Sequence, residues 1–501
     1  MSYRLEAFSS VGLDEALLRL VIDEHTSARV PRLATLWTYF RNPLEPVGVA
    51  GTLLPAQRRG LPSRLTTGGS AAFDDRSQTL REIVIENDIG WRIETMVDFM
   101  FGKPVQLIST AENQSLRRTV ERLLDAVFEH SGGIALLQDM ALLGHVYGYV
   151  DLLLRIDESA LARAGRLWPG DETPGIIDRI ASSIAIEVIE PTRGIPIISP
   201  DDYRRLDAYV VHFEREVNQA EPAPHPRRSL LPRQRPHHGP ARRQRRRSAV
   251  TEIFARGLWQ RYEDEQLIEQ HHSRLLPDVL PIVHVQNLAQ PFRYEGQSEV
   301  EPLIPLQNEL NTRLSDRANR VTMQSFKMYL ATGLDGFDQV PVTPGQVWVT
   351  DNPDARIESF GGDADSPSER AHIDEIREAM DKISGVPPLA GGVIRAKIGN
   401  LSSANALKIT LMGILAKTAR KRVTYGRGMT QICELVLAAL SAAGVLETRP
   451  EDRKLRLLWP DPLPVESKDE AAAAKTKLEL GVPAERVLGE LGYAATDPGI
   501  S

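Results

Sequence analysis

Basic side chains on a glycine-rich segment are the residues of this 501-residue chain best suited to binding a ligand. Between Lys382 and Cys433 the sequence holds nine basic residues and no Asp or Glu. Two of them, Arg395 and Lys397, follow Gly391 and Gly392 in the stretch PPLAGGVIRAKIGN. Ammonium and guanidinium groups contact phosphates without reading sequence. The segment therefore predicts contact with a polyanion or with an acidic neighbouring subunit.

A second basic segment runs from His225 to Arg247. It holds nine arginines and no acid, and five of them gather near its end: Arg242, Arg243, Arg245, Arg246 and Arg247. Repeated prolines and the absence of aromatic residues predict a disordered insertion over residues 218–248. Because the whole chain has a net charge of −7, the residues outside the two basic segments carry −25. We predict an acidic body with two basic segments.

Catalytic and metal-binding patterns are missing from the sequence. It contains no GxxxxGK[ST], HExxH or GxSxG motif, and its single cysteine, Cys433, excludes an internal disulfide and a thiolate metal cluster. No nucleophile, base and oxyanion set can be assembled from its residues. We therefore predict that the protein is not an enzyme, with no catalytic residue, no metal and no cofactor.

The most apolar window, residues 134–157, is interrupted by Gln138, Asp139, His145 and Asp151. A membrane-spanning helix needs ~20 residues nearly free of charge. The window instead predicts a buried helix, a turn at Gly144 and a strand. We expect no membrane association.

The rest of the chain predicts an α+β fold that is mainly helical. Residues 1 to about 130 are mostly helical in pattern, and short β-like runs such as YVDLLLRI and AYVVHFERE fill residues 147–217 and resume at 249. Leucines at steps of three and four predict one stripe of a long helix over residues 299–330, with Arg313, Arg317 and Arg320 projecting elsewhere. A Pro- and Gly-punctuated β-like stretch follows at 331–365.

Two further helices are predicted after that stretch. Ser366, Pro367 and Glu369 form a capping-box start, the apolar stripe is Ile373, Ile376, Met380 and Ile383, and Gly385 before Pro387 predicts a left-handed end. A second long helix is predicted over residues 402–445, with Gly426 and Gly428 as points of bending. The C-terminal residues predict a strand-like end, a proline break and two short helices.

Several motifs in this order resemble the portal proteins of tailed bacteriophages. They are IVHVQN followed by GQSEVEPLIPLQNEL, then Ser384-Gly385-Val386-Pro387, then SSANALK from Ser402 to Lys408, and WPDPLPVES near the C-terminus. The resemblance covers about residues 80–495. Ser403 stands where the family often has glycine, and the basic insertion has no counterpart in the general pattern.

The resemblance implies a ring, usually of twelve subunits, at one capsid vertex through which double-stranded DNA is packaged and ejected. It implies contacts with the terminase large subunit, a head–tail connector or adaptor, and the major capsid and scaffolding proteins. The protein is then expected in the virion, and in the host cytoplasm during assembly. The implied parts are a wing (1–298), stem helices (299–330 and 366–386), a clip (331–365), a tunnel loop (387–401), a long wing helix (402–445) and a crown (446–501).

Two alternatives remain open at this stage. The chain is instead a non-enzymatic nucleic-acid-binding packaging or regulatory protein if the arginine-rich segment is its main binding element. Within the portal interpretation, the basic residues of the loop and the long helix, together with Arg313, Arg317, Arg320 and Lys382 of the stem, face either DNA or the carboxylates of neighbouring subunits.

Overall fold

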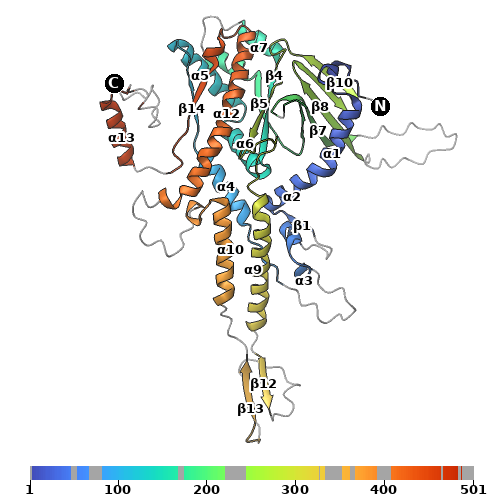
Figure 1. Cartoon of the computed structure of the whole chain (residues 1–501), viewed down its shortest axis with the longest axis vertical. Helices are drawn as coiled ribbons and strands as arrows, with labels where there is room; N and C mark the ends of the chain where they lie inside the picture. The colour runs from blue at the N-terminus through green and yellow to red at the C-terminus, as the bar shows by residue number, and fades with distance from the viewer. Residues whose placement is uncertain are drawn as a thin grey trace, which may run out of the picture.

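The protein consists of a broad body, a stem of two helices below it and a two-stranded hairpin beyond the stem (Figure 1). The computed structural model describes residues 3–46, 53–66, 82–166, 174–202, 204–219, 244–325, 328–332, 352–360, 367–391, 408–463, 467–482, 484 and 487. Within these residues the fold is α+β, as predicted.

The body is built around a three-stranded antiparallel sheet in the order β11-β4-β5. Its strands are β4 (Tyr149–Ile156), β5 (Ile184–Ile189) and β11 (Ile282–Gln286). Val150, Leu152 and Leu154 of β4 alternate along the strand and pack in one large apolar core with the long helix α12 (Met412–Ala442). The other helices and strands of this part are α4 (Asp88–Phe101), α5 (Gln114–His130), α6 (Ile134–Tyr147), α7 (Glu158–Gly165), α8 (Pro174–Ala181), and the paired strands β3 (Gln106–Ser109) and β14 (Leu455–Leu458).

The predicted turn at Gly144 is wrong. The helix α6 continues through Gly144 to Tyr147, and the chain reverses at Gly148, which has a φ of 92°. Gly144 is required for packing, because a β-carbon there would lie 2.0 Å from the hydroxyl of Tyr425 on α12. A glycine inside a helix is thus a site of close approach here and does not end the helix.

A five-stranded antiparallel sheet, in the order β10-β9-β8-β7-β6, forms the outer part of the body. Its strands are β6 (Gly194–Ile198), β7 (Leu206–Gln219), β8 (Gln244–Ala255), β9 (Leu258–Glu263) and β10 (Gln266–His272). One face is covered by the N-terminal elements η1 (Glu6–Val11) and α1 (Glu15–Glu24), whose Phe8 and Leu18 pack on Val210 and Ile253.

The prediction of a disordered insertion at 218–248 is wrong at both ends. Strand β7 extends to Gln219 and β8 begins at Gln244, and the two pair as far as Gln219 with Gln244. Arg245, Arg246 and Arg247 therefore lie on a strand. Arg242 and Arg243 lie outside the described residues.

The stem consists of α9 (Ile304–Ser325), which follows the short η4 (Glu301–Leu303), and α10 (Pro367–Ser384). Leu310 of α9 and Ile373, Ile376 and Met380 of α10 are buried in one cluster. The predicted stripe is wrong at its last member, since Ile383 is 45% exposed. Gly385 has a φ of 71°, which confirms the predicted left-handed end of the helix.

The first stem helix is shorter than predicted. It ends at Ser325, and residues 328–332 form β12 (Met328–Thr332), which pairs antiparallel with β13 (Arg356–Phe360). The mixed run KMYLAT suits a strand as well as a helix, and pairing with a segment distant in sequence decides between them. Residues 333–351 and 361–365 of the predicted clip, and the cap Ser366, lie outside the described residues.

The remaining elements surround this frame. They are the π-helical turn η2 (His25–Arg29), α2 (Val30–Arg41), the paired strands β1 (Leu44–Pro46) and β2 (Leu53–Pro55), η3 (Ala56–Gly60), α3 (Ser63–Thr66), η6 (Pro388–Gly391), η7 (Pro450–Arg453) and α13 (Ser467–Glu479). The strand-like end predicted near residue 458 is confirmed by β14. Of the two predicted C-terminal helices, α13 is described.

An extended segment, residues 82–86, lies along α9 and is held there by polar side chains. The backbone groups of Glu82, Val84 and Glu86 bond to side chains at every fourth position of α9: Gln307, Asn311, Ser315 and Asn319. Four helical residues rise about 6.0 Å and two extended residues about 6.6 Å, so the two repeats nearly match. We call this arrangement the polar ladder.

The polar ladder predicts that truncating its side chains exposes the backbone amides of residues 82–86 to hydrogen exchange, and that a buried member has a larger effect than an exposed one. Asn311 is fully buried and bonds to Glu86, Gln307 and Gln57, so Asn311→Ala should destabilise the protein by about 2 kcal/mol. Hydrogen exchange at the amides of residues 82–86 should accelerate at least tenfold. Asn319→Ala, near the exposed end, is the control and should affect only Glu82. Equal exchange in both variants would contradict the role given to the ladder.

Candidate functional site

The predicted loop residues lie in sequence between the second stem helix and α12. The chain passes from α10 through η6 to Gly391 and returns at Lys408, just before α12. Gly391 presses against α4, because a β-carbon there would lie 2.3 Å from Nε1 of Trp91. The other predicted loop residues, Gly392, Arg395 and Lys397, lie outside the described residues.

A buried ionic cluster joins α12 to the start of the first stem helix. The two oxygens of Glu299 lie 2.8 Å from Nζ of Lys417 and 2.8 Å from Nζ of Lys421, and all three side chains are almost fully buried. Lys417 also donates to the backbone oxygen of Ile383 at the end of α10. One pair of lysines therefore fixes α12 against both stem helices.

The charges of this cluster are set by competition between burial and pairing. Burial alone would raise the pKa of Glu299, but Lys421 and Lys417 lower that pKa to about 2. Burial lowers the pKa of Lys421 to about 8, against the opposing effect of Glu299. Burial, followed by the field of Lys421, lowers the pKa of the adjacent His145 well below its usual value, so His145 is neutral at pH 7.

Contacts within the chain account for several of the basic residues of α12. The predicted partner of its basic residues, a polyanion or an acidic neighbouring subunit, is wrong for Lys417 and Lys421, which both bind Glu299 of the same chain. The guanidinium carbon of Arg422 lies 5.1 Å from the ring centroid of Trp459, and Arg422 donates to the backbone oxygen of Pro460. Lys408, Arg420 and Arg427 remain exposed.

Arg92 on α4 holds the end of the second stem helix. Its side chain is 2% exposed; Nη2 lies 2.7 Å from Asp381 and 3.2 Å from Asp88, and Nη1 donates to Ser384 Oγ and to the oxygen of Val386. The Ser384-Gly385-Val386-Pro387 motif is thus the binding partner of an arginine. Sequence reasoning missed Arg92, although its position on the apolar face of α4 between Ile89, Ile93 and Met96 marks it as a buried charge.

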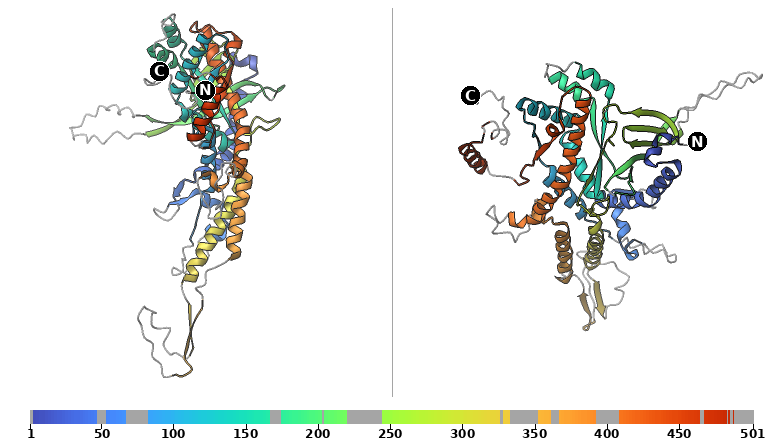
Figure 2. Two further views of the ribbon diagram at one scale, coloured as in Figure 1. Left: turned by 90° about the vertical axis from the view of Figure 1, so that its left-hand side faces the viewer. Right: turned by 45° about the horizontal axis from the view of Figure 1, so that its top comes forward.

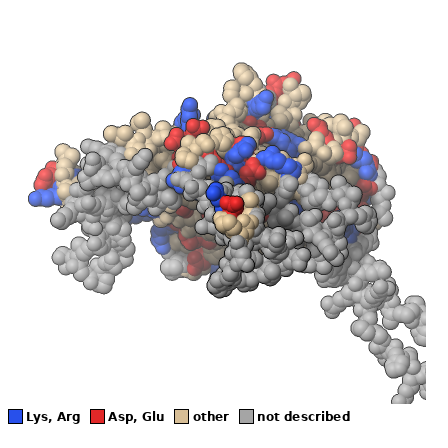
Figure 3. Space-filling model, turned by 90° about the horizontal axis from the view of Figure 1, so that it is seen from below, with Lys and Arg blue, Asp and Glu red and all other residues tan. Residues whose placement is uncertain are grey.

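The predicted basic residues of the stem are partly neutralised within the chain. Arg313 pairs with Glu309 at 2.7 Å, and Arg320 pairs with Glu369 of α10. For Arg317 and Lys382, no ion pair is found in the described part of the chain. Figure 3 shows acidic and basic side chains interspersed over the described surface seen from below.

Arg247, near the end of the basic insertion, is exposed. Its Nη1 lies 3.5 Å from Oε2 of Glu214 on the paired strand β7. The backbones of Arg245 and Arg246 pair with Asn218 and Val217. The strands therefore hold both ends of the arginine-rich segment.

One buried cluster contains an Asp and a His, as a catalytic triad does, but its polar atoms already have hydrogen-bond partners within the cluster. Asp151 accepts hydrogen bonds from Tyr209, Tyr294 and Nδ1 of His284, each at 2.7 Å, while Nε2 of His284 faces the oxygen of Tyr294, also at 2.7 Å. Both ring nitrogens of His284 are engaged with oxygen atoms of the cluster, so neither is available to a substrate. The cluster connects β4, β7 and β11 and is structural.

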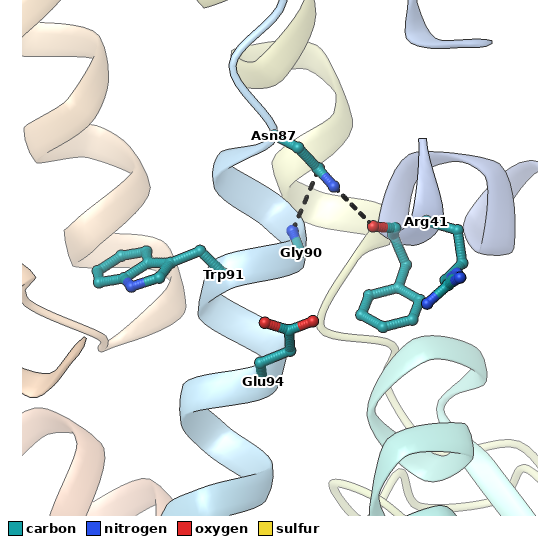
Figure 4. Close-up of a pocket in the computed structure, with 6 residues that line it drawn as sticks. Arg41, Asn87, Gly90, Trp91 and Glu94 are labelled. Carbon is teal, nitrogen blue, oxygen red and sulfur yellow. Dashed lines mark hydrogen bonds between the residues drawn. The ribbon is translucent and has the colours of Figure 1, made fainter. Parts of the chain in front are cut away.

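A pocket of about 280 Å³ lies between α2 and α4. Asn87 bonds to Phe40 and Gly90, and Trp91 and Glu94 project from successive turns of α4 (Figure 4). These side chains do not form a nucleophile and base pair. Among the described residues no group of three or more His, Cys, Asp or Glu is arranged to hold a metal, and no helix is long and apolar enough to cross a membrane.

Comparison with known proteins gives one family match. Residues 246–492 match the model described as "Phage portal protein, SPP1 Gp6-like", and this range includes both stem helices, η6 and α12. No curated protein matched the chain. Among solved structures, a chain of "Virion of native gene transfer agent (GTA) particle" is 12% identical, with 81% of this chain and 89% of that chain covered and a TM-score of 0.39.

The family match confirms the resemblance drawn from the motifs over residues 246–492. Portal proteins are structural components of a phage virion and not enzymes. The match begins at residue 246, so the arginines before it and the N-terminal elements lie outside the matched range.

The ionic cluster predicts a sharp effect of neutralising its single carboxylate. Glu299→Gln leaves two buried ammonium groups without a counter-charge and should destabilise the subunit by about 3–5 kcal/mol. Replacing all three residues, as Glu299→Gln with Lys417→Met and Lys421→Met, should restore most of that loss. Glu269→Gln on the exposed strand β10 is the matched control. Denaturant unfolding measures all of these variants.

The same cluster predicts acid sensitivity. The folded pKa of Glu299, about 2, lies below the ordinary 4.5, so its contribution is complete above about pH 4.5 and is lost as the pH falls toward 2. The triple variant should lose less stability over that range. An identical acid profile in the wild type and the triple variant would contradict the assignment.

Proposed function

We propose that this chain acts as a phage portal protein and forms a ring at a single capsid vertex, through which double-stranded DNA enters and leaves. The observation that carries the proposal is the family match over residues 246–492, which includes the whole stem, η6 and α12. The rigid stem with a hairpin at its far end supports it, because a ring of such subunits encloses a channel lined by repeated elements. A ring of twelve is the expected size.

In this proposal the parts of the chain have separate roles. The wing, the stem, the tunnel loop and the crown surround the channel, and the clip projects beyond the stem. The ranges are 1–298 for the wing, 299–330 and 366–386 for the stem, 331–365 for the clip, 387–401 for the tunnel loop, 402–445 for the long wing helix and 446–501 for the crown. The ordered helical part of the first stem range is α9.

The clip is proposed to dock the terminase large subunit during packaging and the head–tail connector or adaptor afterwards. The hairpin of β12 and β13 lies at the end of the molecule farthest from the body (Figure 1), where a second protein can reach it. The body is proposed to contact the major capsid and scaffolding proteins. Assembly then takes place in the host cytoplasm and the finished protein lies in the virion.

A conduit for DNA must hold the duplex loosely. Phosphate contacts by Lys and Arg satisfy this requirement because they do not depend on sequence and weaken with salt. We assign this role to Arg395 and Lys397 on the segment that starts at Gly391. The close approach of Gly391 to Trp91 and the buried ion pairs of Arg92 and Lys417 hold the described elements on either side of the segment.

The arginine-rich segment supports a second candidate function, nucleic-acid binding outside the channel. The observation that favours it is the long pairing of β7 with β8, which carries Arg245, Arg246 and Arg247 away from the sheet on a two-stranded arm. Under this alternative the chain is a packaging or regulatory protein that binds nucleic acid through Arg242 to Arg247 and forms no ring.

Negative-stain electron microscopy and solution mass measurement test the choice. The purified wild-type protein should form rings of about twelve subunits, and deletion of residues 225–247 should leave them intact. Loss of DNA binding on that deletion, in a protein that never forms rings, would favour the second candidate. A strictly monomeric protein under all assembly conditions would overturn the portal proposal.

Charge reversal tests the proposed tunnel loop. Arg395→Glu with Lys397→Glu should leave ring formation unchanged and reduce DNA packaging or retention at least tenfold, because the phosphate contacts become repulsive. The control is Arg395→Lys with Lys397→Arg, which keeps both charges. Normal packaging by the reversed variant would remove the two residues from the DNA path. Loss of the ring itself would show instead that they pair with neighbouring carboxylates.

A further inference from the structure

The N-terminal elements form a layer of their own on the five-stranded sheet. Residues 3–29 include η1, α1 and η2. Their buried side chains, among them Phe8 and Leu18, belong to one apolar cluster with the sheet. Figure 2 (right) shows this segment, in dark blue, beside the green strands of the sheet. The next helix, α2, packs in the apolar cluster of the stem instead. We call residues 3–29 the N-terminal layer.

His25 lies where this layer ends. It opens the π-helical turn η2, in which the amide of Val30 bonds to the oxygen five residues earlier, and its side chain is 2% exposed. Nε2 lies 2.9 Å from the backbone oxygen of Thr192, in the turn between β5 and β6. Because a carbonyl oxygen can only accept, Nε2 donates and the neutral ring carries its proton there. A neutral histidine therefore holds the end of the layer on the sheet.

The other ring nitrogen of His25 makes protonation unfavourable. Nδ1 is buried and has no hydrogen-bond partner within the part of the chain that the structure describes. A second proton would go to this atom and would place a charge and an unpaired N–H in the interior. Burial accordingly lowers the pKa of His25 below the ordinary 6.5, against the effect of the bond to Thr192. Of the charged groups that face the ring, Arg29 lowers the pKa further, and Glu295, which raises it, is already paired with Arg29 and Arg32.

A second histidine, His212 of β7, lies at the same contact. Its Nδ1 lies 2.9 Å from Oγ1 of Thr251 on β8, and that hydroxyl lies 3.3 Å from the hydroxyl of Tyr3. These three groups connect the start of the N-terminal layer to the sheet, as His25 connects its end. Burial lowers the pKa of His212 as well, and a charge on His25 lowers it further.

The charged groups near His212 already have partners. Glu214, which raises the pKa of His212, lies 3.5 Å from Arg247 on the paired strand β8. The amide of His212 bonds to the backbone oxygen of Arg193, and the guanidinium group of Arg193 is paired with Glu190. The surroundings of both histidines therefore favour the neutral ring.

We propose that His25 and His212 form an acid-sensitive latch, which holds the N-terminal layer on the sheet while both rings are neutral and releases it when they are protonated. The hinge is η2, because Arg29 at its other end stays bound to Glu295 in the segment before the stem. Release uncovers the apolar face that β7 and β8 present to the layer. The latch is a property of the single chain and does not depend on the proposed ring.

The direction of the pH effect follows from the two states of the layer. In the released layer both rings have their ordinary pKa of about 6.5, whereas in the docked layer the pKa of each ring is lower. The docked layer is therefore most stable above about pH 6.5 and loses stability as the pH falls below that value. The ionic cluster at Glu299 responds only below about pH 4.5, so the two effects are measured separately.

Hydrogen exchange of the full-length protein, read by mass spectrometry and corrected for the intrinsic effect of pH, tests the latch. Between about pH 7.5 and pH 5.5 the protection of the amides of α1 should fall at least tenfold, because a ring with an ordinary pKa is about ten times more often protonated than neutral at the lower pH. Amides of α12 between Ile432 and Leu440 lie in the large core and are the internal control. Their protection should stay the same.

Two substitutions remove the titrating rings and keep their hydrogen bonds. In His25→Gln the amide nitrogen replaces Nε2, and in His212→Asn a side-chain amide atom replaces Nδ1. The double variant should show equal protection of α1 at both pH values. Each single variant should lose part of the response, which gives the same test if the double variant has a released layer at both pH values. His130→Asn, at the exposed end of α5, is the matched control and should keep the wild-type response.

Three results would overturn the latch. Unchanged protection of α1 in the wild type would show that the layer stays docked in acid. An equal loss of protection throughout the chain would show that acid unfolds the whole protein. A full wild-type response in the single and double variants would assign the effect to other groups. Ring formation does not enter this measurement, so the latch and the portal function stand or fall separately.

Discussion

The arrangement of the stem depends on one buried carboxylate. Glu299 lies just before the first stem helix and binds two lysines of α12, and one of these lysines reaches the last turn of the second stem helix. Burying three charged groups is unfavourable unless each finds its partner. Any displacement of α12 by more than about an ångström would leave an unpaired charge in a dry interior. The cluster therefore contributes to a defined geometry more clearly than to stability.

Other contacts at the stem base follow the same principle. Arg92 binds the end of α10 through the Asp381 carboxylate, the Ser384 hydroxyl and the backbone oxygen of Val386, and the polar ladder fixes residues 82–86 along α9. Apolar packing in the stem is limited to a narrow stripe around Leu310 and Met380. Directional polar contacts set the register of the helices, since hydrogen bonds weaken steeply when their geometry changes. The body, with its large apolar core, supplies the bulk of the stability.

Local features of the fold could be predicted from the sequence, and contacts between distant segments could not. The start of α10 at Pro367, the left-handed Gly385 and the alternating strands of the body follow from rules that act over a few residues. The pairing of Glu299 with Lys417, the role of Arg92 and the strand at residues 328–332 depend on partners distant in sequence. Gly144 shows the same division, because a glycine signals a turn locally, whereas Tyr425 makes it a packing position. Of the predicted site, the structure describes Gly391 and the stem arginines but not Arg395 or Lys397.

The absence of acidic residues between Lys382 and Cys433 now has a physical explanation in several parts. A carboxylate on the inner face of α12 would compete with Glu299 for Lys417 and Lys421 and would itself need a counter-charge in the interior. On the outer face of the helix Arg420 and Arg427 lie exposed. The argument from Glu299 does not apply to Arg395 and Lys397, which lie outside the helix in sequence. Their positive charge is the part of the window that we propose for contact with DNA.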